Sequence, residues 1–448
     1  MKSRSRMVVT AALLVAVVLA AGAFGISRMP EFDEIEIAAD AEVIAPGVVA
    51  ASAGPPAATL DGLIAQLQTR LDAVPLDHVA WSTLGIAYVQ QARVTADPSL
   101  YPRAEGALDE SLAVEPDDNF LAYAGLSSLA SARHDFTAAK DFAEQGLAIN
   151  LFSPILYGAL SDAEVQLGNY AAARAAVDQM LRLSPDTSSY SRSSYLAELN
   201  GDIAFATAQM TEALDGAGSP TDRAFALTIL GDLAFNSGRP GDALTLYNRA
   251  QGEAPQDAAS LFGKARSEAA LGQTQTALDH YAELVAIAPE PSFLIGYGEL
   301  LESAGFVDEA ERQYAVVADV QQLFEANGVE SDAAPVLFLA DHGEPERALR
   351  EAERAVSARP FLAMHDAHAW ALYVNGRHED ALTAIGKAME LGSSNAQFHF
   401  HAGMIHLALG DESMAREQLE TALALNPFFD PLDAPIAEAT LTELAADG

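Results

Sequence analysis

The sequence of 448 residues contains no cysteine. This excludes disulfides, thiolate metal sites, a cysteine nucleophile and a lipid anchor attached through cysteine. Basic residues are scarce, with 25 lysines and arginines against 63 aspartates and glutamates, which gives a formal net charge of −38. Nucleic acids and anionic lipids need a basic protein surface, so this charge argues against both as partners. It favours a partner that is basic or neutral.

Motifs that carry common chemistries are missing as well. The chain has no phosphate-binding G-x-x-x-x-G-K-[ST], no G-x-S-x-G nucleophile elbow, no H-E-x-x-H and no EF-hand spacing. Pairing any two of its many carboxylates as acid and base would be arbitrary, because most are expected on solvated faces. We therefore expect a non-enzymatic protein with no catalytic residue, no metal site and no cofactor.

Residues 7–26, MVVTAALLVAVVLAAGAFGI, are almost entirely apolar and follow Lys2, Arg4 and Arg6. The run is long enough to span a bilayer, and the basic residues before it favour a cytoplasmic N-terminus with the rest of the chain outside. The small residues AGA near its end also suit signal peptidase. We interpret residues 1–28 as a transmembrane anchor or a cleaved signal peptide, with a buried core helix as the third alternative.

Either of the first two interpretations places the remainder of the chain outside the cytoplasm, in the periplasm or the extracellular space. The protein would be membrane-anchored if this segment is retained and secreted if it is cleaved. Residues 29–57 start acidic and end in Ala, Gly and Pro, which is typical of a flexible linker. Residues 58–448 then form the folded domain.

An alanine recurs every 33 to 38 residues through this domain. The ten alanines are Ala104, Ala139, Ala173, Ala206, Ala243, Ala277, Ala310, Ala348, Ala381 and Ala415. A glycine lies five residues earlier in eight units, at Gly168, Gly201, Gly238, Gly272, Gly305, Gly343, Gly376 and Gly410. A proline lies twelve residues later in six units, at Pro116, Pro185, Pro255, Pro289, Pro360 and Pro427. Glycine ends a first helix, alanine lets two helices cross closely, and proline ends the second, so each unit is a helical hairpin.

A hairpin of this kind cannot bury its apolar face alone, and stacked neighbours form a solenoid. The period and the stretch WSTLGIAY at 81–88 resemble the tetratricopeptide repeat, over about residues 58–448. The resemblance implies an all-α fold, an α-solenoid of about ten helical hairpins. Residues 58–74 and 432–445 each have the pattern of a cap helix.

Two units depart from the repeat. The first has seven extra residues between Trp81 and Ala104. The unit that leads to Ala348 has Pro335 where an apolar core residue would lie, and a longer helix precedes it.

The family resemblance also implies which residues line the concave surface. With the recurring alanine counted as position 20, these are positions 2, 5, 9, 12 and 13 of each unit. Acidic and aromatic residues alternate there, which suits an extended or helical segment with basic and apolar side chains. The predicted partner-binding residues are Asp366, Trp370, Tyr373, Phe400, Met404, Phe262, Arg266, Asp232 and Phe235. Trp370 is one of two tryptophans in the chain, and tryptophan is enriched at binding hot spots.

The stretch FHFHAGMIH at 398–406 contains three histidines. The family resemblance implies that positions 4, 7 and 11 pack inside the hairpin. His399 and His406, with His365 and His368 of the preceding unit, fall at these positions, where an imidazole would replace an aromatic ring. His399 and His401 lie on nearly opposite faces of one helix and cannot bind one ion together. His365, His368 and His399 could still converge from neighbouring units, so metal binding stays open as an alternative.

Three functions follow from these patterns. The first is a non-enzymatic protein–protein interaction scaffold with a concave acidic and aromatic groove. The second is an assembly or maturation factor for an exported or membrane complex. The third is a metal-binding protein that uses the C-terminal histidines.

Overall fold

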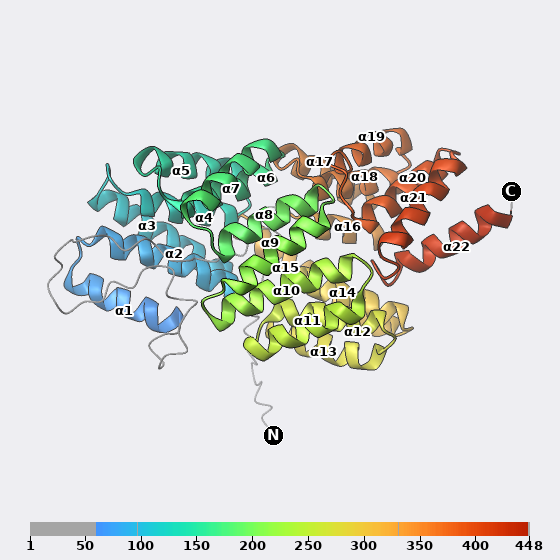
Figure 1. Cartoon of the computed structure of the whole chain (residues 1–448), viewed down its shortest axis with the longest axis horizontal. Coiled ribbons are helices and arrows are strands. Elements are labelled where there is room, and N and C mark those ends of the chain that lie inside the picture. Colours follow the sequence, from blue (N-terminus) through green and yellow to red (C-terminus); the bar gives the residue numbers. More distant parts are fainter. Residues whose placement is uncertain (1–59, 96, 330, 447–448) are drawn as a thin grey trace, which may run out of the picture.

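The computed structural model describes residues 60–95, 97–329 and 331–446. In these ranges every regular element is a helix, and ten antiparallel hairpins follow one another between α1 (Leu60–Ala73) and α22 (Asp433–Ala446) (Figure 1). The predicted all-α solenoid is therefore confirmed. The apolar run at 7–26 and the linker lie outside the described residues, and none of the described helices is long and apolar enough to cross a membrane.

The first helices of the hairpins form one series along the solenoid and the second helices another. The first helices are α2 (His78–Thr95), α4 (Phe120–Ala132), α6 (Pro154–Gln166), α8 (Thr187–Leu199), α10 (Pro220–Asn236), α12 (Ala258–Ala270), α14 (Pro291–Ser303), α16 (Ala333–Asp341), α18 (Leu362–Val374) and α20 (Ala396–Ala408). The second helices are α3 (Tyr101–Val114), α5 (Phe136–Ile149), α7 (Tyr170–Leu183), α9 (Ile203–Asp215), α11 (Pro240–Glu253), α13 (Thr274–Ile287), α15 (Val307–Ala326), α17 (Pro345–Ala358), α19 (His378–Ala388) and α21 (Glu412–Leu425).

The recurring residues have the roles that their spacing predicts. All ten recurring alanines are fully buried, with an exposed fraction of 0%. All eight recurring glycines have a positive φ, the left-handed conformation that ends the first helix. Each recurring proline lies two residues after the end of a second helix, because a proline disfavours helical geometry in the residue before it.

The two irregular units also fold as their sequences indicate. The extra residues of the first unit extend α2 to Thr95 and form the short 3-10 helix η3 (Pro98–Leu100) before α3. In the later unit, α15 has 20 residues, whereas the following α16, which contains Pro335, has nine.

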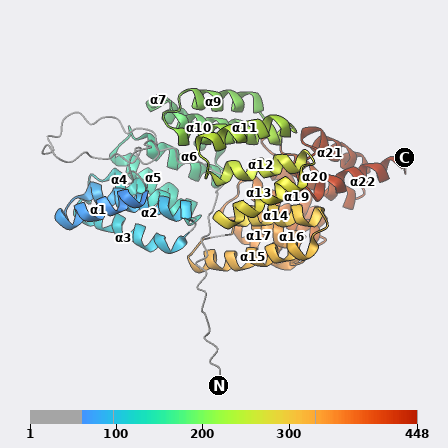
Figure 2. The ribbon, with the colours of Figure 1, turned by 90° about the horizontal axis from the view of Figure 1, so that it is seen from below.

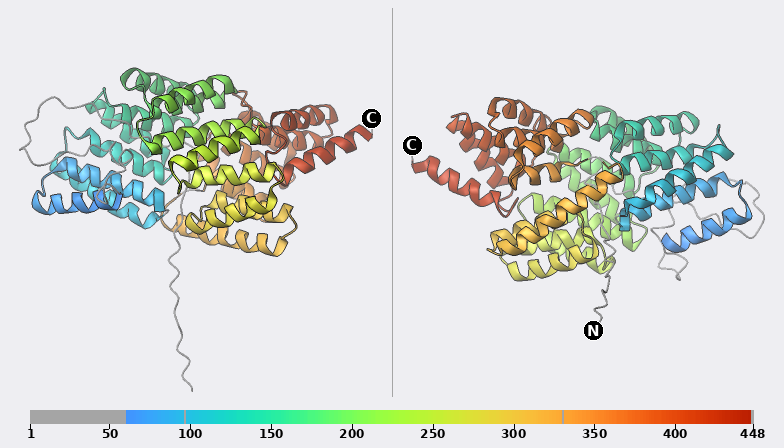
Figure 3. Two further views of the ribbon diagram at one scale, coloured as in Figure 1. Left: turned by 60° about the horizontal axis from the view of Figure 1, so that its bottom comes forward. Right: turned by 180° about the vertical axis from the view of Figure 1, so that it is seen from behind.

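The solenoid winds through two superhelical turns, and the second lies against the first. We define the first superhelical turn as α1–α11 and the second as α12–α22. Late helices lie beside early ones, for example α17 beside α6 in Figure 1, and Figures 2 and 3 show the same stacking from other sides. A single cluster of buried apolar side chains contains residues from 63–132 and from 261–338. The tyrosine hydroxyl of Tyr170 accepts a hydrogen bond of 2.9 Å from the backbone N–H of Leu362, 192 residues later.

Candidate functional site

A row of ionisable side chains runs along the first helices from α8 to α20 and reaches α22. Each of these helices contributes one member, and we call the row the charged stripe. Its members are Glu198, Asp232, Arg266, Glu299, Asp341, Asp366, His401 and Asp433. Electrostatic interactions link these side chains along the row. The stripe is predominantly acidic, because six of its eight members are carboxylic acids.

The carboxyl groups in the first half of the stripe hold their protons unusually firmly. Burial, with a contribution from the neighbouring Asp232, raises the pKa of Glu198 to about 7. Burial likewise raises the pKa of Asp232 to about 6, although the Tyr247 hydroxyl, which donates to Asp232 at 2.6 Å, and the Arg266 guanidinium both oppose the shift. Burial disfavours the charged form of a carboxyl group unless a cation or hydrogen-bond donors compensate.

The second half of the stripe is more crowded with acids. Burial and the carboxyl group of Asp430 raise the pKa of Asp433 to about 8. Burial raises the pKa of Glu299 well above its usual range, and nearby carboxylates add to the shift. Asp430 and Asp341 contribute most among these carboxylates. Asp341 is open to solvent on one side, yet desolvation of its carboxyl group raises its pKa to about 6.

Trp370 is the centre of an aromatic stack in this second half. Its indole ring lies between the Tyr373 ring, at a centroid distance of 4.6 Å, and the His401 imidazole, at 4.2 Å. Its Nε1–H donates a hydrogen bond of 2.5 Å to Oδ1 of Asp341. The Phe400 ring lies 5.8 Å away. The structure therefore brings together the residues of α18 and α20 that position counting placed in one patch.

His401 and Asp366 form a buried pair behind this stack. Nδ1 of His401 lies 2.8 Å from Oδ1 of Asp366, and the side chains are 1% and 2% exposed. Burial lowers the pKa of His401, but the Asp366 carboxylate and the more distant Asp433 and Asp341 outweigh this effect, so the pKa is raised.

The predicted residues of the earlier units form a second cluster. The Arg266 guanidinium carbon lies 4.3 Å from the centre of the Phe235 ring and 5.4 Å from that of Phe262, which is cation–π geometry. Phe262 also packs against Phe293 at 4.9 Å.

The nine predicted partner-binding residues differ in how much surface they offer. Asp366, Trp370, Phe400 and Phe235 are buried, with exposed fractions of 1%, 6%, 1% and 3%. Tyr373, Met404, Phe262, Arg266 and Asp232 are half-buried. The half-buried group is therefore what a partner could touch, and partner binding by all nine stays a prediction.

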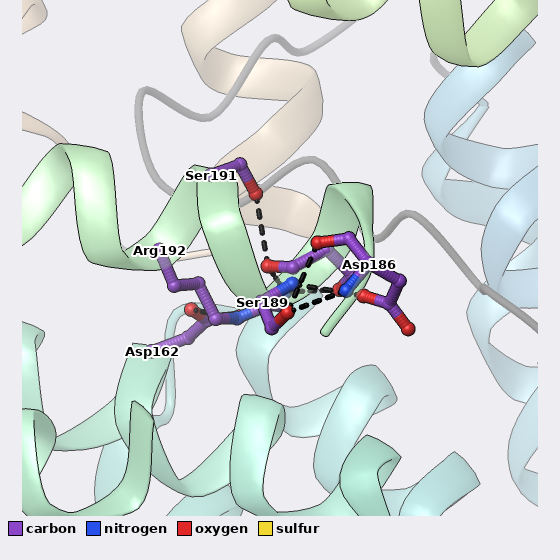
Figure 4. A network of polar contacts seen from close by, with 6 residues as sticks. Asp162, Asp186, Ser189, Ser191 and Arg192 are labelled. Carbon is purple, nitrogen blue, oxygen red and sulfur yellow. Dashed lines mark hydrogen bonds and ion pairs between the residues drawn. The ribbon is translucent and has the colours of Figure 1, made fainter. Parts of the chain in front are cut away.

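A comparable buried pair joins α6 to α8 (Figure 4). Nε and Nη2 of Arg192 donate to the two carboxylate oxygens of Asp162 at 2.8 and 2.7 Å, and the Arg192 side chain is 3% exposed. Nη1 donates to the backbone oxygen and the hydroxyl of Ser188. Gly158 gives the guanidinium room, because a side-chain carbon there would lie 3.2 Å from its central carbon. The start of α8 is fixed by Asp186, which accepts a hydrogen bond from the Ser189 backbone.

The four histidines predicted to pack inside the hairpins are all half-buried. Nδ1 of His399 on α20 lies 2.7 Å from the amide oxygen of Gln418 on α21, the partner helix of its hairpin. Burial lowers the pKa of His365 to about 4. In residues 60–95, 97–329 and 331–446, no group of three His, Asp or Glu side chains is arranged to hold a metal ion.

A family model described as a tetratricopeptide repeat matches residues 228–291 and 367–429. These two stretches are tetratricopeptide repeats. The two matches cover the hairpins that carry Asp232 with Arg266 and those that carry Trp370 with His401. No curated protein matches this chain.

Solved structures similar to this chain share little sequence with it. One from Parabacteroides merdae, also a tetratricopeptide repeat protein, is 19% identical; the match covers 58% of this chain and 98% of that one, with a TM-score of 0.33. The APC/C hetero-tetramer Cut9–Hcn1 is 14% identical, with coverage of 86% and 82% and a TM-score of 0.44. Yeast Tom70 is 13% identical, with coverage of 81% and 96% and a TM-score of 0.34. Matches at these levels identify no partner.

Sequence reasoning did not include His401, Asp341 and Asp433 in the site. His401 occupies position 6 of its unit, from which its side chain reaches the preceding first helix, and Arg192 occupies the same position in its own unit. A basic residue at position 6, 30 to 35 residues after an acid, is the signal that could have found both pairs.

Proposed function

We propose that the charged stripe and the half-buried aromatic residues beside it bind a cationic segment of a partner protein. The tetratricopeptide repeat fold supports a protein–protein interaction scaffold, and proteins of this family are generally non-enzymatic. The observation that carries the more specific proposal is the raised pKa of successive carboxyl groups, Glu198, Asp232, Glu299, Asp341 and Asp433. Such groups lack sufficient compensating positive charge, and lysine or arginine side chains of a partner would supply it.

This proposal has a pH signature. A cationic partner favours the ionised carboxylates, so its binding should release protons from groups with pKa values between about 6 and 8. Affinity should therefore rise with pH through this range. It should fall as salt is added.

Site-specific photo-crosslinking in the host tests the location of binding. The native chain lacks cysteine, so Tyr373→Cys on the concave face and Glu283→Cys on the outer helix α13 each carry one crosslinker. Glu283 is exposed, which makes it the matched control. We expect a partner adduct at residue 373 that mass spectrometry traces to a basic segment, and little at 283. Adducts of equal yield at both positions would place binding outside the groove.

We also propose that the repeat domain lies outside the cytoplasm, held by or released from the membrane. The apolar run at 7–26 with basic residues before it supports this proposal. A reporter that is active only in the cytoplasm, fused after Gly448, should be silent, while a reporter that needs export should be active. The opposite result would place the scaffold inside the cell.

A further inference from the structure

The eight recurring glycines fall into two groups by what surrounds them. A side-chain carbon built on Gly168 would lie 2.9 Å from the backbone oxygen of Pro360, and one on Gly238 would lie 3.0 Å from that of Leu425. One on Gly201 would overlap the backbone oxygen of Gly392. The five glycines of the second superhelical turn have open space, with nothing within 4 Å: Gly272, Gly305, Gly343, Gly376 and Gly410. Glycine is therefore needed for backbone conformation at all eight positions, but for close approach at three.

These three close approaches form one continuous contact, which we call the inter-turn contact. In each, the loop inside a hairpin of the first superhelical turn meets the backbone at or shortly after the C-terminal end of a second helix in the second superhelical turn. Side chains extend the contact, because Tyr170 and Leu199 pack against the buried cluster of α18–α20. The Tyr170 hydroxyl also satisfies an N–H in the first turn of α18, a helix whose N-cap residue Phe361 makes no side-chain capping bond.

One earlier hairpin joins the same contact in a different way. His134 occupies the glycine position there and has a φ of 63°, the left-handed conformation that L-residues rarely adopt. Its imidazole is buried and stacks on Phe136 at 5.9 Å. The guanidinium of Arg359, from the second superhelical turn, lies 5.5 Å from the Phe136 ring. Burial raises the pKa of Asp332, but Arg359 and His134 outweigh burial and hold it below its usual value.

We propose that the inter-turn contact is a closure that holds the two superhelical turns together and that separation along it opens the concave face. Helices within one superhelical turn pack side by side with their neighbours in the chain, whereas the closure at Gly168, Gly201 and Gly238 is made by loops and the end of a helix. The two superhelical turns also share apolar side-chain contacts, among them those of Tyr170 and Leu199 with the cluster of α18–α20. Contacts between the turns give way before the packing within each turn, because the most extensive helix–helix contacts join neighbours in the chain.

The closure has a direct consequence for the binding face. A partner segment reaches the charged stripe from the ends of the superhelix while the contact is made, and from the side once it separates. This consequence rests on the proposed function, whereas the closure itself does not. Its test therefore uses the full chain without any partner.

Distance measurements between two spin labels report on the closure. Ala204→Cys on α9 and Glu390→Cys after α19 place exposed labels on opposite sides of the contact in a chain that has no other cysteine. We expect one narrow distance distribution for the doubly labelled protein. A broad distribution centred on long distances would overturn the closure.

Gly201→Ala and Gly376→Ala form a matched pair of variants in this labelled background. Both glycines follow an asparagine, occupy the same position of the repeat and have φ values of 72° and 73°, so both variants carry the same backbone strain. Only residue 201 faces the other superhelical turn closely. We expect Gly201→Ala to lengthen and broaden the label distance and to melt several degrees below Gly376→Ala. Equal distances and equal melting temperatures for the two variants would refute the proposal.

A milder variant covers the case in which Gly201→Ala fails to fold. Tyr170→Phe removes the hydroxyl that accepts from Leu362 and keeps the ring. It should add a minor population with a long label distance, while the helical circular dichroism spectrum stays unchanged. An unaltered distribution would show that the hydroxyl does not hold the contact and would count against the closure.

Discussion

A buried charge pair joins α6 to α8, and another joins α18 to α20. The two charge pairs differ in whether the basic side chain can lose its proton. Arg192 donates two hydrogen bonds to the carboxylate of Asp162 and a further one to the backbone oxygen of Ser188. His401 offers Asp366 one hydrogen bond and lies against Trp370. An arginine stays protonated at any physiological pH, whereas a histidine does not. The Arg192–Asp162 pair therefore stays charged at physiological pH, whereas the charge of His401 in the second pair depends on pH.

The surroundings sharpen this difference. Near the arginine pair lies a second cation, the half-buried Arg93. Burial together with Arg192 lowers the pKa of Arg93, although Tyr101 and Asp162 oppose this. Near the histidine pair, the neighbours are acids, and Asp433 has its pKa raised to about 8. The negative charge around α18–α22 is therefore reduced by protonation of carboxyl groups rather than balanced by arginine or lysine side chains.

The largest expected effect comes from breaking the Arg192–Asp162 pair. Arg192→Met leaves the Asp162 carboxylate buried without its partner, which should lower the free energy of unfolding by about 3–5 kcal/mol. Urea denaturation measures it. The surface variant Arg312→Met is the control, because Arg312 is mostly exposed in its pair with Glu309 and should cost under about 0.5 kcal/mol. Adding Asp162→Leu should restore part of the loss, and no recovery would show that the guanidinium stabilises chiefly by packing.

His401→Phe should have a smaller effect that depends on pH. The pKa of His401 in the folded chain lies above its ordinary value of 6.5, so the stability from this pair is fully present below about pH 6.5 and is lost as the pH rises through the folded-state value. We expect a loss of about 1.5–3 kcal/mol at pH 5.5 and a clearly smaller one at pH 8.5. Urea denaturation at the two pH values gives both numbers, and the loss for Arg192→Met should be the same at each. A larger loss for His401→Phe at pH 8.5 would contradict the comparison.

The smallest effect is expected at the edge of the histidine pair. Trp370→Phe keeps an aromatic ring in the stack and removes the Nε1–H that donates to Asp341. Asp341 is open to solvent and can bind water instead, so the loss should be about 0.5–1.5 kcal/mol. The urea midpoint and the near-ultraviolet spectrum report on it. A loss as large as that of Arg192→Met would mean that the indole ring, and not the charge pair, holds α18 and α20 together.

The local architecture of this solenoid could be predicted because each rule acts within one hairpin. A fully buried Ala243, a left-handed Gly238 and a helix that ends two residues before Pro255 follow from packing and backbone geometry at short range. The neighbourhood of Trp370, Tyr373 and Phe400 followed from the same counting.

Burial of the site could not be predicted in this way. Trp370 is 6% exposed because Tyr373 and His401 cover both faces of its ring, and position counting does not describe how far a neighbouring ring extends over it. The approach of Gly168 to Pro360 depends on small rotations between successive hairpins that add up over 192 residues. The pattern of a repeat of about 34 residues does not specify this accumulated rotation. The charges near Asp433 were missed because they come from the C-terminal cap, which lies outside the repeat.

The inter-turn contact also determines how this chain must fold. A solenoid whose hairpins touch only their neighbours can begin folding anywhere and unravel from its ends, because every stabilising contact is local. Here the hydrogen bond from Leu362 to Tyr170 and the contact between Gly201 and Gly392 each join residues that are separated by nearly half of the chain. The hairpins between the two partners must be folded before these contacts can form. Contacts of such long sequence separation slow folding, since the loop entropy must be lost before they form. Once formed, these contacts couple the unfolding of α6–α11 to that of α17–α21. Unfolding of the C-terminal hairpins therefore exposes the middle of the chain as well as its end.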